Sequence, residues 1–252
     1  MNAYSSLARF YDSLTEDVPY KAFADFYREI FRLYGLDVKT MLDLACGTGT
    51  LTHLLASRGY EMIGIDSSPE MLSIAVAKQR QSGNPLCKKP MFICQPMEEL
   101  DLYGTVNAAV CALDGVNYPP PELLCEVFRR VELFLDPGGV FIFDINTPRK
   151  LRNLDGSIFL DETDDVFCVW RAEFSEADNA CFYGMDVFAK SGDFWTRGSE
   201  EHIEYAHEPQ ELLRILEEAG FVDIKLFGEL EIREPTEDEE RIFIAARKKG
   251  SL

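Results

Sequence analysis

The stretch Leu42–Thr50, LDLACGTGT, joins the end of a predicted strand to the start of a predicted helix. The apolar run Thr40–Ala45 is short and continuous, as expected for a strand buried on both faces. Gly47 and Gly49 allow the backbone to turn sharply, and a helix beginning near Thr50 leaves free N–H groups beside the turn. The sequence therefore predicts a ligand-binding loop at the end of this strand.

Two details separate this loop from other nucleotide-binding loops. A dinucleotide fingerprint has a third Gly or Ala where this chain has Thr52, and the Gly-Lys-Ser/Thr of a P-loop is absent. Asp43 lies inside the strand, where a carboxylate suits a ligand that carries an ammonium group. Asp66, at the end of the next predicted strand, is placed to accept hydrogen bonds from both hydroxyls of a ribose. The alternative for Asp66 is a helix cap.

Strands alternate with helices on both sides of the loop, which favours an α/β fold with a parallel, doubly wound sheet. The apolar pattern of residues 20–35 predicts a helix that Gly35 ends, and further helices are expected from Thr50, after Ser67 or Ser68, and from the prolines 119–121. The turn Asp136–Gly139 is expected before the fifth strand. The predicted strands of this part are Thr40–Ala45, Glu61–Asp66, Pro90–Cys94, Val106–Cys111 and Val140–Ile145.

A different pattern follows from about Ile158 to His207, where strand-like stretches alternate with turn signals and no helix is expected. We interpret it as an antiparallel β insertion, or lid. A helix over Pro209–Ala219 and strands over Phe221–Phe227 and Arg241–Arg247 then complete the chain. The predicted organisation is an N-terminal helical segment (1–36), a core (37–150 and 208–250) and the lid (151–207).

The composition excludes several classes of function. The 252 residues carry a formal net charge of −19, so most of the surface repels a phosphate backbone, which disfavours a nucleic-acid partner. The seven cysteines form no Cys-x-x-Cys pair and are expected to be reduced thiols, and no cluster has metal-ligand spacing. Because there is no signal-peptide pattern and no membrane-spanning run, we expect a cytoplasmic protein with no membrane contact.

Several motifs resemble those of class I methyltransferases that use S-adenosylmethionine (SAM). Asp43–Gly49 resembles motif I of that family, and Ile63–Leu72 resembles motif II with its following helix. Leu113–Tyr118 is similar to motif IV of a bacterial subgroup of small stand-alone enzymes, and Asp136–Asp144 is similar to the motif before strand five. The N-terminal pattern of Tyr4, Ala8, Tyr11, Asp12 and Tyr20 resembles the cofactor-covering segment of that subgroup.

The resemblance implies a Rossmann-like, seven-stranded, mostly parallel sheet with helices on both faces and SAM as cofactor, with S-adenosylhomocysteine (SAH) as product. It implies that Asp43 and the backbone around Ala45–Gly49 hold the methionine moiety, that Asp66 holds the ribose, and that Met71 and Met97 pack near the adenine. The implied cofactor-binding residues are Tyr4, Tyr11, Tyr20, Asp43, Ala45, Cys46, Gly47, Gly49, Asp66, Ser67, Met71, Pro96, Met97 and Leu113.

Pro96 departs from the family pattern, which usually has an acidic residue there to bond the adenine amino group. Proline offers neither a side-chain acceptor nor a backbone N–H. Adenine recognition is then expected to rest on the Met97 backbone and apolar packing, or on Gln95. Since such a hydrogen bond contributes about 1 kcal/mol net, we expect weaker but not abolished binding.

Methyl transfer relies largely on positioning and desolvation, so a dedicated base is not required. The candidate catalytic residues are Asp114 and Tyr118, which follow the fourth strand, and His202, the best base by type. The alternatives are a loop-capping Asp114, a packed Tyr118 and a solvated or ion-paired His202, which alternation places away from Ile203 and Tyr205.

The predicted function is a SAM-dependent methyltransferase that acts on oxygen, nitrogen or carbon of a small-molecule acceptor, as a monomer or homodimer. The aromatic content of the predicted lid motivates the small-molecule acceptor. Two alternatives remain from the sequence. One is a SAM-binding partner or sensor with little activity, and the other is a nicotinamide-dependent oxidoreductase, which Thr52 and the C-terminal hairpin disfavour.

Overall fold

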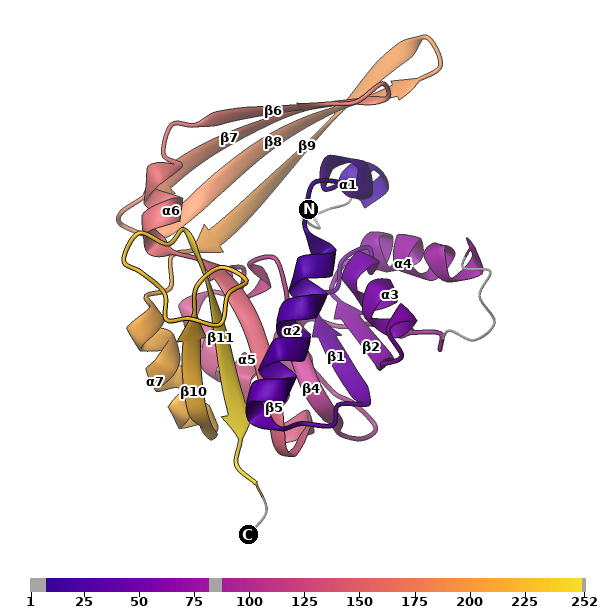
Figure 1. Cartoon of the computed structure of the whole chain (residues 1–252). Coiled ribbons are helices and arrows are strands. Elements are labelled where there is room, and N and C mark those ends of the chain that lie inside the picture. Colours follow the sequence, from indigo (N-terminus) through magenta and orange to yellow (C-terminus); the bar gives the residue numbers. More distant parts are fainter. Residues whose placement is uncertain (1–7, 82–87, 251–252) are drawn as a thin grey trace.

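The computed structural model describes residues 8–81 and 88–250, which form a seven-stranded sheet and a four-stranded sheet (Figure 1). In the large sheet, the neighbouring strands from β5 to β3 are parallel, and β11 is antiparallel to both of its neighbours. This arrangement confirms the predicted Rossmann-like, mostly parallel sheet. The strands, in spatial order, are β10 (Phe221–Phe227), β11 (Arg241–Lys248), β5 (Leu135–Asn146), β4 (Val106–Cys111), β1 (Thr40–Leu44), β2 (Glu61–Asp66) and β3 (Met91–Cys94).

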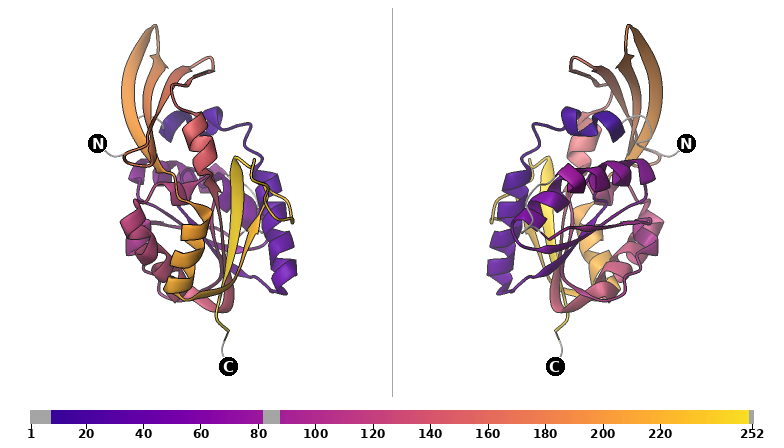
Figure 2. Two further views of the ribbon diagram at one scale, coloured as in Figure 1. Left: turned by 90° about the vertical axis from the view of Figure 1, so that its left-hand side faces the viewer. Right: turned by 90° about the vertical axis from the view of Figure 1, so that its right-hand side faces the viewer.

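Helices cover both faces of the large sheet (Figure 2). α2 (Tyr20–Tyr34) and α3 (Thr50–Ser57) pack on one face, and α5 (Pro121–Phe134) and α7 (Pro209–Ala219) pack on the other. α4 (Pro69–Gln81) contacts β2 and β3. Its cap is Ser68, whose Oγ accepts a hydrogen bond from the Met71 N–H at 3.2 Å. Gly35 and Gly220 end α2 and α7 in the left-handed conformation, as their sequence positions predict.

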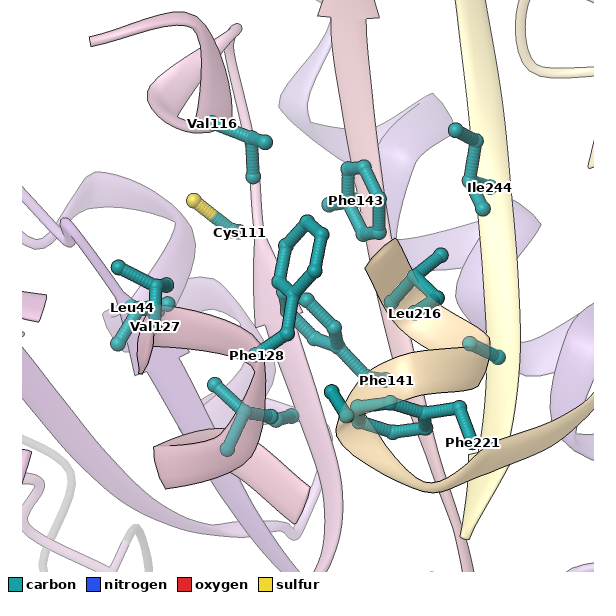
Figure 3. Close-up of a cluster of buried hydrophobic side chains, with 14 of the residues drawn as sticks. Leu44, Cys111, Val116, Val127, Phe128, Phe141, Phe143, Leu216, Phe221 and Ile244 are labelled. Atoms are coloured by element: carbon teal, nitrogen blue, oxygen red, sulfur yellow. The ribbon is translucent and has the colours of Figure 1, made fainter. Parts of the chain in front are cut away.

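Aromatic side chains fill the space between β5 and the helices α5 and α7 (Figure 3). Phe128 of α5 lies with its ring centroid 5.6 Å from that of Phe143 and 6.1 Å from that of Phe141. The three rings are fully buried, and Leu216 of α7 belongs to the same cluster. This packing fixes β5, and therefore the edge of the sheet where β5 ends.

The start of β5 differs from the prediction. The sequence predicts a turn over Asp136–Gly139, whereas the strand already begins at Leu135 and continues to Asn146. Val106 pairs with Leu135 and Ala108 with Val140, so extra residues bulge from β5 between the two pairs. Gly138 takes a φ of +82° there, which glycine adopts without strain. The turn signal therefore marks a bulge inside the strand.

The predicted insertion is the four-stranded antiparallel sheet, which arches over one edge of the large sheet (Figure 1). The short helix α6 (Pro148–Asn153), absent from the prediction, leads into it. Between this sheet, the lid, and the core lies α1 (Ala8–Leu14), whose Phe10 and Leu14 pack against the lid cluster of Val166 and Met185. The lid strands are β6 (Ile158–Glu162), β7 (Val166–Ser175), β8 (Ala180–Ser191) and β9 (Phe194–Tyr205).

Among the described residues, no helix combines the length and the apolar character needed to cross a membrane.

Candidate functional site

A cavity of about 300 Å³ opens at the carboxyl ends of β1, β2 and β4. The strand order reverses between β1 and β4, and ligands of open α/β sheets bind in the crevice at such a switch point. The lining residues are Tyr11, Tyr20, Asp43, Ala45, Cys46, Gly47, Thr48, Thr50, Leu51, Asp66, Ser67, Ser68, Met71, Met97, Ala112, Leu113, Gly115 and Tyr118.

The loop after β1 turns through three left-handed residues. Ala45, Gly47 and Gly49 have φ of +56°, +54° and +71°, so the chain reverses within five residues and α3 begins at Thr50. Ala45 and Gly47 line the cavity, as predicted. Gly49 does not line it. A Cβ there would lie 3.0 Å from the Ala75 Cβ, so Gly49 permits close packing of the loop on α4.

Two carboxyl groups face the cavity from neighbouring strands. Asp43 of β1 is buried, and its Oδ2 accepts a 2.5 Å hydrogen bond from the Thr52 hydroxyl. Burial raises the pKa of Asp43 to about 7, the Thr52 hydrogen bond opposes the rise, and the Asp66 charge adds to it. Asp66 of β2 accepts hydrogen bonds at 2.8 Å from the N–H groups of Gly47 and Ser68. Its backbone contacts orient this carboxylate beside the loop.

The N-terminal segment contributes Tyr11 of α1 and Tyr20 of α2 to the cavity lining. Burial raises the pKa of both phenols, so both are neutral hydrogen-bonding groups at neutral pH. The third predicted tyrosine, Tyr4, lies outside the described residues.

The predicted adenine end is apolar. Met71 and Met97 line the cavity, whereas Pro96 does not and instead precedes the short helix η1 (Met97–Glu99). Gln95, one predicted substitute for the missing acidic side chain, donates its side-chain amide to the Asp101 carbonyl at 3.4 Å. Gln95 does not line the cavity either.

The loop after β4 brings Leu113 and Tyr118 to the cavity, as predicted. Asp114 is close to the cavity but is not part of its lining. Its Oδ1 accepts a 2.7 Å hydrogen bond from Arg241 of β11, in a largely buried ion pair. Asp114 also precedes the short helix η2 (Gly115–Asn117), without a side-chain cap hydrogen bond.

His202 reaches the same region from the lid strand β9. Its ring centroid lies 6.4 Å from that of Tyr118, and its Nε2 lies 3.5 Å from a carboxylate oxygen of Glu200. Both side chains are almost completely buried, at 2% and 3% exposure, so the solvated alternative for His202 is wrong. Glu204, two residues further on, is also buried, and burial together with the Asp114 charge raises its pKa.

The sequence did not single out several residues of this site. The N-terminal motif includes Asp12 without giving it a role, and in the structure its carboxylate accepts hydrogen bonds from Thr48 of the loop after β1 and from Thr50 at the start of α3. Glu200 and Glu204 could have been found from the sequence, because strand alternation places them on the same face of β9 as His202. The other missed residues are Thr48, Thr50, Leu51, Ser68, Lys78, Ala112, Gly115, Asp144 and Arg241.

Comparison with known proteins agrees with this geometry. Residues 41–139 match the family model of a methyltransferase domain. A crystal structure of a SAM-dependent methyltransferase from Clostridium acetobutylicum ATCC 824 is 32% identical, covers 99% of this chain and 100% of that one, and superposes with a TM-score of 0.85. The chain therefore belongs to the SAM-dependent methyltransferases, and SAM is its cofactor. This membership replaces the nicotinamide-dependent alternative.

Two curated relatives extend the comparison. YqeM of Bacillus subtilis (strain 168), named provisionally as a methyltransferase, is 29% identical over 99% of this chain and 98% of its own length. The ubiquinone biosynthesis O-methyltransferase of Pseudomonas paraeruginosa (strain DSM 24068 / PA7) is 33% identical over 117 residues, which are 46% of this chain and 48% of that protein. The first likeness spans the lid, whereas the second covers less than half of each chain.

Proposed function

We propose that this methyltransferase acts on an oxygen, nitrogen or carbon atom of a small molecule that binds between the cofactor cavity and the lid. The observation that carries the proposal is the approach of His202, on the lid, to Tyr118, which lines the cavity. A reacting atom at this end of the cavity is therefore covered by the lid sheet. Such a roofed site fits a small acceptor better than a duplex or a folded protein.

The residues around the cavity fit the cofactor chemically. Asp43 offers a carboxylate for an ammonium group, and Asp66 offers one for ribose hydroxyls. The bare backbone of Gly47 gives close access to the loop, while Met71 and Met97 offer apolar contact. When bound, SAM would supply a methyl group on a positively charged sulfur: an electron pair of the acceptor would form the new bond to the methyl carbon, and the sulfur would keep the pair of the broken bond as the uncharged thioether of SAH.

The groups at the lid end would hold the acceptor and its proton. Tyr118 would contact the acceptor, and the buried His202 would receive the proton that an oxygen or nitrogen acceptor loses. Glu200, with a carboxylate oxygen 3.5 Å from the His202 Nε2, would hold the imidazole in place. Asp114, tied to Arg241 next to the cavity, would help to orient the acceptor.

The name of one relative and the net charge of the chain support a small-molecule acceptor. The ubiquinone biosynthesis enzyme of P. paraeruginosa carries an O-methyltransferase name, and it is 33% identical to this chain over 117 residues. The formal net charge of −19 adds to the case against a nucleic-acid acceptor.

The test is methyl transfer from isotopically labelled SAM to three fractions of a cell extract, namely small molecules, total RNA and protein. We expect label and SAH formation with the small-molecule fraction. Label found only in RNA or protein would overturn the small-molecule proposal. SAH binding without product in any fraction would favour the alternative of a SAM sensor.

Two pairs of variants then test the lid end. His202→Gln should lower turnover strongly, whereas His53→Gln, which changes a histidine of α3 bonded to the Ala75 carbonyl, should not. Glu200→Gln should lower turnover and Glu201→Gln should not, because Glu201 is exposed and on the opposite face of β9. Equal effects on turnover within each pair would show that His202 and Glu200 of the lid take no part in methyl transfer.

A further inference from the structure

Two consecutive residues of the loop after β4 have an unfavourable backbone. Leu113 and Asp114 both have positive φ, +57° and +54°, although neither is glycine. Side chains with a Cβ rarely adopt this conformation, and it persists only where the surroundings hold it. Leu113 lines the cofactor cavity and Gly115 follows in the same wall, so the conformation of this turn shapes the cavity.

Asp144, at the end of β5, holds both residues by their backbone. Its Oδ1 accepts a hydrogen bond from the Leu113 N–H at 2.9 Å, and its Oδ2 accepts one from the Asp114 N–H at 3.0 Å. The Asp144 residue has no exposed surface. A single buried carboxylate therefore uses both of its oxygens to fix two neighbouring amides.

Arg241, at the start of β11, completes the arrangement. Its Nη1 is hydrogen-bonded to Oδ2 of Asp144, and its Nη2 donates to Oδ1 of Asp114 at 2.7 Å. Burial raises the pKa of Asp144, and the charge of Arg241 opposes that rise. The planar fork of a guanidinium can donate to two carboxylates at once in a fixed geometry, which an ammonium cannot do as well.

We propose that Asp144 and Arg241 are positioning residues that hold Leu113 and Asp114 in the shape that cofactor binding requires. Asp144 holds the backbone of the turn through both of its oxygens, and Arg241 pairs with that carboxylate while fixing the Asp114 side chain. Neither residue lines the cavity, so both act through the turn. The proposal rests on this cavity being the SAM site.

The test is calorimetric titration of the full chain with SAH, which needs no known acceptor. Arg241→Lys keeps the charge between the carboxylates but loses the fork. We expect its SAH dissociation constant to rise about fivefold to tenfold, with the thermal midpoint close to that of the wild type. The matched control is Arg247→Lys in the same strand, where the arginine Nε donates to the Gly138 carbonyl away from the site.

Hydrogen exchange adds a readout that a purely structural ion pair would not change. The amides of Leu113 and Asp114 should exchange faster in Arg241→Lys than in the wild type, while other core amides keep their protection. SAH affinity within about twofold of the wild type, with both amides still protected, would overturn the proposal.

A second variant keeps the test valid if Arg241→Lys does not fold. Asp144→Asn with Asp114→Asn and Arg241→Met replaces all three charges of this buried cluster by neutral groups, a change that folded proteins often tolerate. It too should weaken SAH binding, since the amide oxygen can serve only one of the two N–H groups well. Asp66→Ala tests separately whether this cavity is the SAM site. If Asp66→Ala leaves SAH binding intact, the assignment of the cavity fails; if it weakens binding and the Arg241 variants do not, the positioning role fails.

Discussion

Lys78 of α4 and Asp12 of α1 form an ion pair, with Nζ 2.7 Å from the Asp12 Oδ2. The Oδ1 atom of Asp12 also accepts hydrogen bonds from the hydroxyls of Thr48 at 2.6 Å and Thr50 at 3.0 Å. Burial raises the pKa of Asp12, but the bonds from Lys78 and Thr48 outweigh it and the pKa is lowered. Since Tyr11 lines the cavity one residue earlier, these bonds fix α1 beside the cavity, and we expect α1 to cover the bound cofactor.

Asp12→Ala should therefore speed SAH dissociation. The pair is partly exposed, so the bonds together contribute only about 1 kcal/mol, which corresponds to a roughly fivefold weaker affinity. Stopped-flow displacement of SAH measures the rate directly. Asp17→Ala, an exposed change in the segment just after α1, is the control. A dissociation rate in Asp12→Ala equal to that of the control would mean that α1 does not gate cofactor release.

Asp43 predicts a pH dependence of cofactor binding. Its pKa of about 7 means that the carboxyl is largely protonated in the ligand-free protein below that pH. An ammonium group prefers the ionised carboxylate, so binding at lower pH must release a proton. SAH affinity should then fall as pH decreases from about 7.5 to about 5.5, approaching tenfold per unit at the acidic end. Calorimetry in buffers of different ionisation enthalpy should detect the released proton.

Asp43→Asn provides the contrast for this profile. The amide cannot ionise, so SAH binding should be weaker at pH 7.5 and nearly independent of pH over the same range. The effect of Asp43 on the folding stability of the ligand-free protein has the opposite pH dependence to its effect on SAH binding. Because the folded pKa is raised from 3.8 to about 7, Asp43 favours the folded state at low pH and loses that contribution as pH rises across this interval. An unchanged pH profile in Asp43→Asn would assign the titration to another group.

The fold could be predicted from the sequence because its signals are local. β2, β4, α7 and β10 have the predicted bounds, since apolar runs, proline at helix starts and glycine at helix ends mark each element independently. The bulge at Asp136–Gly139 could not be predicted from the sequence, because turns and bulges favour the same residue types and differ only in how the neighbouring strand pairs.

The residues of the candidate site could be predicted only where they belong to a local sequence motif. Most of the predicted cofactor contacts, including Asp43, Asp66 and Leu113, do line the cavity. Arg241 has no such signal, because it meets Asp114 across 127 positions through the antiparallel placement of β11 beside β5. The burial of His202 depends on which face of the lid turns inward, which alternation alone does not tell.

Gly64 of β2 offers a test of how tightly the loop after β1 is packed. A Cβ at this position would lie 2.8 Å from the Phe92 ring and 2.9 Å from the Cys46 Sγ. Gly64→Ala should therefore destabilise the protein by about 1–3 kcal/mol, since the ring and the sulfur must shift within a packed core. Thermal unfolding should show a midpoint lower by about 2–4 °C for each kcal/mol.

Gly104→Ala is the matched control for Gly64, because a Cβ there has no atom within 4 Å and its backbone is not in the left-handed region. Cys46 lines the cavity, so Gly64→Ala should also weaken SAH binding while Gly104→Ala does not. A midpoint equal in the two variants would show that Phe92 moves aside at little cost.

A substitution at Pro96 can test adenine recognition through a gain in SAH affinity rather than a loss. The residue precedes η1 with φ −74° and ψ 159°, an extended backbone that aspartate also adopts and favours before a helix. Pro96→Asp introduces the acidic side chain that the family usually has there. If that side chain accepts from the adenine amino group, SAH should bind about threefold to tenfold more tightly, as for one net hydrogen bond of about 1 kcal/mol.

Pro96→Ala makes the same backbone change without an acceptor and should not tighten binding. The gain should also disappear with S-inosylhomocysteine, whose base carries an oxygen in place of the amino group. Equal tightening of SAH and S-inosylhomocysteine would point instead to a better-formed η1, and no tightening of either would place the adenine amino group beyond the reach of residue 96.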